Sequence, residues 1–255
     1  AGGFNEEGRG LITGLNQDAQ RIFLNLIGQP QRNYTADDPG DSMCYIAAHD
    51  GLTLHDTITH NAQLDESIPA QRQEIIRRIM LGNFFVLTSQ SIPFLHGGQE
   101  RGRTKPRLNA NSEYIGNFIR NSYDSSDNIN QLIWDIDSDY RQLLDYTRGL
   151  INIRRNNRAF RIGEMEAVNT ACELIAHENR KVVAYSISYE GDTFLLLVNA
   201  DAEPVEIETG FEVESAQVLA DSDEASADGV STVSGLSLTG TSVQLEGLTA
   251  VLLRL

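Results

Sequence analysis

Cysteine and lysine are scarce in this chain. Its 255 residues include two cysteines, Cys44 and Cys172, and two lysines, Lys105 and Lys181. The cysteines lack the close spacing of a zinc site, and two of them do not make a disulfide framework. Cys44 stands in an apolar run and is expected to be a small buried hydrophobic residue. No glycine-rich phosphate loop precedes a helix either, so no metal and no cofactor are predicted in this chain.

Long apolar runs and an excess of basic charge are also missing. No run reaches membrane-spanning length, and the first ten residues show no signal-peptide pattern, which a fragment would have lost in any case. The 36 acidic and 20 basic residues give a net charge of −16, which disfavours nucleic acid and anionic membranes as partners. An ordinary acidic surface and adaptation to salt both stay open, as do extracellular and cytoplasmic locations.

A period-two hydrophobic pattern begins after about residue 162. Fifteen acidic residues but only three basic ones follow residue 167. Short strands are predicted at 182–188, 193–199, 203–208, 212–219 and 249–255. They favour an antiparallel β-sandwich, in which the stretch ADSDEASADG (220–229) is expected to be a mobile, acidic surface loop. The sequence therefore predicts two domains, 1–162 and 163–255.

Three helices are predicted in the first part from their start and stop signals. The first has Asp18 in its opening turn and ends at Gly28. A longer helix is predicted to open at Pro69 and to end before Pro93. The prediction rests on apolar residues that return at helical spacing between these two prolines. A third spans about 137–156.

The most informative stretch is SMCYIAAHDGLTLHD (42–56), in which an apolar strand leads to His49 and Asp50 and a helix pattern follows. A second such segment, SQSIPFLHGGQERGRTK (89–105), comes after the long helix. Strand, helix and strand thus follow in the order of a parallel βαβ unit. Catalytic residues of a (β/α)8 barrel lie at the C-terminal ends of its strands, a position that His49 and Asp50 would fit. The competing interpretation is that the pair caps the next helix.

These two segments, with NSYDSSDNIN (121–130) behind them, resemble the last part of the catalytic barrel of the α-amylase superfamily, and most of all its debranching pullulanases and isoamylases. YIAAHDGLTLHD is similar to the family's fourth signature region, after barrel strand seven, and SQSIPFLHGGQE to strand eight and its exit. RTK followed by NSYDSSDNIN is similar to a cleft-lining loop of pullulanases. The resemblance covers roughly residues 1–160 and, more weakly, a C-terminal β-domain. It implies an α/β part, the last strands and helices of a (β/α)8 barrel, followed by an all-β sandwich.

The resemblance also implies roles for individual residues. Asp50 would stabilise the transition state, because it holds sugar hydroxyls more tightly as the ring distorts toward an oxocarbenium-like state. His49 would donate a hydrogen bond to the same sugar. Tyr123, Asp127 and Asn130 match the pullulanase loop and would contact the substrate. Ordinary turn chemistry is the alternative for these three.

Other residues near these segments receive weaker assignments. Arg103 and Lys105 are expected to orient the loop at 121–130 or to pair with aspartates. Trp134, the only tryptophan, is expected in the core. For His96 a cleft-facing and a structural position both stay open.

The chain departs from the family pattern at several points. Gly51 stands where pullulanases place Asn, as in isoamylase-type enzymes, and His55 stands where an aromatic residue is common. Retaining glycosidases also need a carboxylate nucleophile and an acid. This family takes both from strands four and five, and nothing in the chain matches those signatures.

The sequence therefore predicts the C-terminal fragment of a glycoside hydrolase that cleaves α-1,6 branch bonds of pullulan, starch or glycogen with retention. The fragment alone is expected to be inactive. A non-catalytic glycan-binding or structural module stays open as an alternative, and so does an isoamylase-type or α-1,4-acting amylase.

Truncation of a barrel has a physical consequence. Two parallel strands cannot close a barrel, and the faces that met the missing strands would be apolar and unpaired. The expected partners are the remaining N-terminal part of the enzyme and an α-glucan substrate. The barrel segment is expected to lean on the sandwich, to self-associate or to be partly disordered. Calcium binding by the parent enzyme stays open.

Overall fold

The computed structural model describes residues 9–30, 35–109, 111 and 114–255. Residues 1–8, with which the predicted first domain begins, lie outside this part. Its helices are α1 (Ala19–Leu26), α2 (Leu54–Ala62), α3 (Pro69–Thr88), α4 (Asp127–Asn130), α5 (Ser138–Asn156) and α6 (Met165–Ala171). Its strands are β1 (Met43–Cys44), β2 (Ile92–Pro93), β3 (Pro106–Leu108), β4 (Tyr114–Phe118), β5 (Cys172–Ile175), β6 (Val182–Tyr189), β7 (Asp192–Asn199), β8 (Val205–Glu208), β9 (Gln217–Ala220), β10 (Leu236–Thr239), β11 (Ser242–Leu245) and β12 (Thr249–Arg254).

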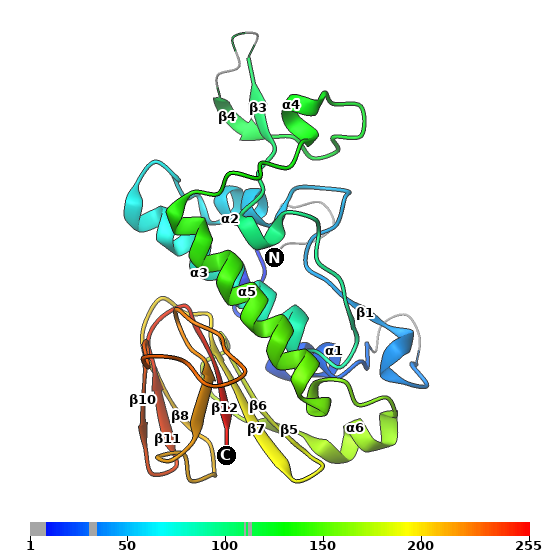
Figure 1. Ribbon diagram of the computed structural model, residues 1–255, viewed down its shortest axis with the longest axis vertical. Helices are drawn as coiled ribbons and strands as arrows, with labels where there is room; N and C mark the ends of the chain where they lie inside the picture. The colour runs from blue at the N-terminus through cyan, green and yellow to red at the C-terminus, as the bar shows by residue number, and fades with distance from the viewer. Residues whose placement is uncertain (1–8, 31–34, 110, 112–113) are drawn as a thin grey trace.

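The three predicted helices are confirmed as α1, α3 and α5. Asp18 caps α1 by accepting a hydrogen bond from the Gln20 amide at 3.0 Å, and Asp137 caps α5 in the same way. Pro69 occupies the first turn of α3, where its missing N–H costs nothing. The guanidinium of Arg154 on α5 satisfies three carbonyl groups between the end of α3 and β2. The two long helices lie side by side across the middle of the molecule (Figure 1).

The C-terminal part consists of two antiparallel sheets. One has the strand order β5-β6-β7-β12-β9 and the other β10-β11-β8. Side chains alternate along the central strands, as the pleat requires. On β7, Phe194, Leu196 and Val198 belong to the core shared with the helices, whereas Leu195 and Leu197 belong to the core between the two sheets. This strand is apolar on both sides because both of its faces are buried.

A single hydrophobic core connects the helices with the five-stranded sheet. It contains residues of α1, α3 and α5 together with the helix-facing residues of the sheet. At one point the rings of Phe23 on α1 and Tyr185 on β6 meet edge to face, with centroids 5.6 Å apart. The helical part therefore leans on the sheet, one of the expected outcomes of truncation. The domain boundary at 162/163 stays a prediction.

The predicted parallel pair is present but short. β1 pairs with β2 in parallel, Met43 opposite Ile92, with α2 and α3 between them in sequence. β1 ends at Cys44, so the strand does not run to His49 as predicted. Met43, Tyr45, Ile92 and Phe94 are all exposed large apolar side chains. Cys44 packs against the core that the helices share with the sheet, but it is only half-buried and not buried as expected.

Two other sequence predictions are wrong in detail. The acidic stretch 220–229 is not a simple surface loop, because Asp221 is buried and its carboxylate accepts the amides of Asp223, Glu224 and Ser234, each at 2.9 Å. Composition marked the stretch as polar but did not show that it folds around its own carboxylate. Trp134 is 76% exposed rather than in the core, with the Arg101 guanidinium 5.1 Å from its ring centroid.

The mixed fold class is confirmed, with strand boundaries that differ from the prediction. The strands predicted at 203–208 and 212–219 shrink to β8 and β9. β5, β10 and β11 were not predicted. β10 and β11 pair through a two-residue connection at Gly240 and Thr241, in which Gly240 has a φ of 55°.

Candidate functional site

His49 and Asp50 lie in an exposed turn between β1 and α2. Their side chains are 84% and 80% exposed, and His49 Nε2 lies 3.5 Å from Asp50 Oδ2. α2 is capped instead by Thr53, whose hydroxyl accepts the Asp56 amide at 3.1 Å. The interpretation of the pair as a helix cap is therefore wrong. Within the described part of the chain, His49 is the one basic side chain within 4 Å of the Asp50 carboxylate.

The loop at 121–130 reaches this turn directly. The Gly51 amide donates a hydrogen bond to Asn121 Oδ1 at 3.0 Å, across 70 residues of sequence. On the same loop Tyr123 is 90% exposed, and Asp127 begins α4 with an exposed side chain. Asn121 was not predicted as a site residue, although it opens the segment that carries the resemblance. The structure thus brings the two predicted segments together through a residue to which the sequence assigned no role.

Asn130, predicted to bind substrate, holds its own loop together. Its side-chain amide donates to the carbonyls of Ser122 and Ser125, at 2.6 and 3.0 Å. Its side-chain oxygen accepts the Ser122 hydroxyl at 2.7 Å. The amide group is thus occupied by the loop, whereas contacts of Tyr123, Asp127 and Asn130 with a substrate stay predictions.

Arg103 and Lys105 both contact this loop, which agrees with the first of the two roles expected for them. Arg103 donates to the carbonyl of Gly97 at 3.0 Å and to that of Asn130. Lys105 donates from Nζ to the hydroxyl of Ser122 at 2.6 Å. Two cations from the segment after β2 therefore fix the position of the loop.

The positive charges also act on His96, which is half-buried at the exit of β2. Burial, followed by the charges of Arg103, Lys105 and His49, lowers the pKa of His96 to about 4. Its imidazole is therefore neutral at neutral pH, with one nitrogen to donate a hydrogen bond and one to accept. A hydroxyl group also both donates and accepts a hydrogen bond, so a neutral imidazole can pair with it in either direction. His49 is close enough for its charge to affect His96.

A buried ionic cluster lies at the start of α2, and sequence reasoning missed it. His55 lies 3.1 Å from Asp56 Oδ1 and 3.3 Å from Glu66 Oε2, and Tyr140 donates to Glu66 Oε1 at 2.7 Å. Burial alone would lower the pKa of His55, but the two carboxylates outweigh it and raise the pKa to about 9. The hydrogen bond with His55, followed by the His55 charge, in turn lowers the pKa of Glu66 to about 2 against the opposing effect of burial. The one sequence signal was that His55 stands where an aromatic residue is common.

Gly51 has a φ of 82°, a left-handed conformation that strains most side chains and that Asn tolerates comparatively well. Gly is therefore well suited to this position, and Asn is the side chain that would be tolerated best. We expect Gly51→Ala to lower the free energy of unfolding by about 1 kcal/mol, and Gly51→Asn to lower it by clearly less. Thermal denaturation of the two variants measures the difference. Equal losses would show that the left-handed backbone is not what selects the residue.

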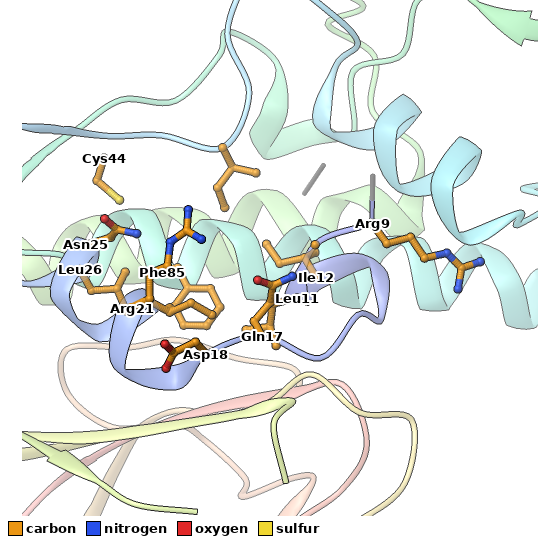
Figure 2. Close-up of a pocket in the computed structure, with 13 residues that line it drawn as sticks. Arg9, Leu11, Ile12, Gln17, Asp18, Arg21, Asn25, Leu26, Cys44 and Phe85 are labelled. Atoms are coloured by element: carbon orange, nitrogen blue, oxygen red, sulfur yellow. The ribbon is translucent and has the colours of Figure 1, made fainter. Parts of the chain in front are cut away.

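A pocket of about 470 Å³ lies between α1, β1 and α3 (Figure 2). Apolar residues such as Leu26 and Phe85 line it, and Arg9 and Arg21 contribute charge. Its one carboxylate, Asp18, caps α1. The pocket contains none of the predicted site residues and is not the candidate site.

The residues that the structure describes lack two further features. They contain no cluster of three or more His, Cys, Asp or Glu side chains suited to hold a metal ion. They also include no helix with the length and apolar character needed to cross a membrane.

Comparison with known proteins covers the whole chain. The family model SpuA C-terminal matches residues 170–255. "Pullulanase A" of Streptococcus pneumoniae is 36% identical over an alignment of 293 residues, which covers 99% of this chain and 23% of that protein. This chain therefore spans less than a quarter of the length of that relative.

Two solved structures are similar to the entire fold. One is the catalytic module of the multi-modular glycogen-degrading pneumococcal virulence factor SpuA in complex with an inhibitor, with a TM-score of 0.92 and 35% identity over 100% of this chain and 41% of that one. The other is the GBS pullulanase SAP in complex with maltotetraose, with a TM-score of 0.91 and 35% identity over 99% of this chain and 37% of that one.

Proposed function

The chain belongs to the pullulanase-type enzymes as a C-terminal part of one, and from this premise we propose that the complete enzyme hydrolyses α-1,6 branch bonds of pullulan, glycogen or starch with retention. The observation that carries the proposal is the exposed His49–Asp50 pair, which is tied through Gly51 to the loop at 121–130. A carboxylate that neither caps the helix nor is buried is free to meet a substrate.

The proposed mechanism divides the work between two parts of the enzyme. Asp50 binds hydroxyls of the sugar at the cleavage point, and these hydrogen bonds strengthen as the ring flattens. His49 donates a hydrogen bond to the same sugar. The carboxylate nucleophile and the general acid come from the N-terminal part of the enzyme, about 5 Å apart as retention requires. The chain alone is therefore inactive under this proposal.

The architecture that goes with this function is a barrel followed by a sandwich. β1 and β2 would be the last two strands of a (β/α)8 barrel, and the two antiparallel sheets would form the sandwich. Met43 and Ile92 are exposed on these two strands, Tyr45 and Phe94 are exposed directly after them, and all four would meet the N-terminal part of the enzyme. The pocket beside β1 (Figure 2) would be covered from the same side.

The substrate class is supported by the names of similar proteins. One neighbour is described as glycogen-degrading, and another was solved with maltotetraose. Both point to α-glucans, which also suit a site of hydroxyl-binding groups such as Asp50, His49 and the neutral imidazole of His96.

The experiment is a comparison of the complete enzyme with the 255-residue chain on pullulan and on amylose, by release of reducing ends. We expect the complete enzyme to cleave pullulan much faster than amylose, because the two substrates differ in their α-1,6 bonds. The chain alone is expected to release nothing from either. Faster cleavage of amylose would show an α-1,4-acting enzyme, and pullulan hydrolysis by the chain would disprove the division of catalytic groups.

A further inference from the structure

Asp56 is fully buried at the first turn of α2 and receives three donors. The Thr104 hydroxyl donates to Oδ1 at 2.5 Å, and the Lys105 amide donates to Oδ2 at 2.8 Å. The ring of His55 lies 3.1 Å from Oδ1. A buried carboxylate is costly unless its oxygens are satisfied, and here they are satisfied by a segment 48 and 49 residues further along the chain.

The contacts continue from that segment into the loop at 121–130. Lys105, whose side chain is buried, donates to the Ser122 hydroxyl at 2.6 Å. Ser122 donates to Asn130 Oδ1 at 2.7 Å, and the Asn130 amide returns to the Ser122 carbonyl at 2.6 Å. The position of the loop therefore depends on where Asp56 holds Lys105.

The loop then closes the circuit at the predicted catalytic turn. Asn121, next to Ser122, accepts the Gly51 amide at 3.0 Å. Gly51 follows Asp50 directly. Two residues later Thr53 caps α2, and Asp56 lies in the first turn of that helix. The turn, the start of α2, the segment at 104–105 and the loop thus form one closed ring of contacts.

The charge of Asp56 is balanced from the other side. His55 lies between Asp56 and Glu66, and Glu66 accepts the Tyr140 hydroxyl from α5. Arg72 of α3 lies over the Tyr140 ring, 5.2 Å from its centroid. The buried carboxylate is therefore anchored to α3 and α5, which belong to the main core.

We propose that Asp56 is a positioning residue of the proposed glucan-cleaving site: its buried carboxylate holds residues 104–105, and through Lys105 and Ser122 it holds the loop at 121–130 against the His49–Asp50 turn. The proposal rests on the proposed function for its catalytic meaning. Asp56 touches no substrate itself. It acts by fixing the distance between the turn that binds the reacting sugar and the loop that lines the cleft.

The test is Asp56→Asn in the complete enzyme. Asn offers one acceptor oxygen and turns its two N–H donors toward groups that also donate, so the three contacts cannot all be kept. We expect amide hydrogen exchange to become at least tenfold faster in peptides that cover 47–53 and 121–130, and to stay unchanged in β6 and β7. We expect kcat on pullulan to fall about tenfold with little change in KM, because a small displacement in a site affects the transition state most.

The matched control is Asp192→Asn, the same chemical change at a sheet residue that pairs with Arg254. It should change neither exchange in these peptides nor kcat. Ser122→Ala is a second test variant, which removes the link between Lys105 and Asn130 and leaves the Asp56 carboxylate unchanged. It should loosen the same peptides if Asp56→Asn fails to fold. Unchanged exchange at 47–53 and 121–130, or a uniform increase over the whole chain, would overturn the proposal. An enzyme without pullulan activity would sink the proposed function, while the exchange result would still decide the role of Asp56.

Discussion

Asp50→Asn in the complete enzyme is expected to lower kcat on pullulan about a thousandfold or more, which corresponds to about 4 kcal/mol of transition-state stabilisation. The variant keeps the shape of the side chain and removes its charge. Asn accepts fewer hydrogen bonds and meets the developing positive charge of the sugar with a neutral group. Contacts that strengthen only in the transition state affect kcat more than KM.

The structure predicts that this loss comes without unfolding. The Asp50 side chain is 80% exposed, and its contact with His49 spans 3.5 Å, so its removal costs little stability. The denaturation midpoint should therefore stay within about 2 °C of the wild type. Steady-state kinetics and thermal denaturation of the same preparation measure both quantities.

Asp145→Asn provides the matched control for this experiment. Asp145 lies on α5 and is also exposed, in an ion pair with Arg148 one helical turn away, so this variant should keep normal turnover. Near-normal turnover of Asp50→Asn would place His49 and Asp50 outside the reacting centre. It would also remove the observation on which the proposed function stands, even though the membership in the pullulanase family would remain.

Local signals in the sequence were enough to predict the helices α1, α3 and α5 and to mark the turn at which the site is proposed. Asp18, Asp137 and Pro69 each mark a helix start through a hydrogen bond or a fixed φ that involves only neighbours. His49 and Asp50 were identified because the family motif around them is contiguous. In both cases the residues that carry the signal are neighbours in sequence.

The contacts that hold the proposed site in place join residues far apart in sequence and could not be predicted in the same way. Asn121 meets Gly51 across 70 residues, and Lys105 meets Asp56 across 49. Neither contact leaves a periodic pattern. Thr53 and Asp56 have the spacing of a helix-capping pair, but the Asp56 carboxylate turns to Lys105 instead of the cap.

Composition is a poor guide where polar residues are buried. The acidic stretch 220–229 was expected to be a mobile loop, yet Asp221 organises it with three backbone hydrogen bonds. Ala225 within it forms an isolated bridge with Ala220 and belongs to the main core. The stretch therefore continues from β9 and packs against α5.

This packing makes Gly149→Ala strongly destabilising. Gly149 lies in the middle of α5, where Ala would ordinarily favour the helix by about 1 kcal/mol. A Cβ at this position would lie 1.8 Å from the carbonyl oxygen of Ala225 and 2.5 Å from its carbonyl carbon. Backbone atoms cannot rotate away, so α5 and the 220–229 segment must separate. Overpacking costs typically about 1–3 kcal/mol, and we expect a net loss of about 2 kcal/mol despite the better helix former.

Gly82→Ala in α3 is the control that separates this clash from the general effect of adding a methyl group at a buried helical glycine. The nearest atoms to a Cβ there are side-chain methyl groups of Ile46 and Leu54, each at 3.1 Å, and these can move by a few tenths of an ångström. We expect the midpoint of Gly149→Ala to fall by about 4–8 °C in thermal denaturation of this chain, and that of Gly82→Ala to fall by less than half as much. Equal shifts would mean that the carbonyl of Ala225 does not limit the approach of α5. A rise in the midpoint of Gly149→Ala would mean that helix propensity outweighs the contact, and that the acidic segment behaves as the loosely held loop that its composition suggested.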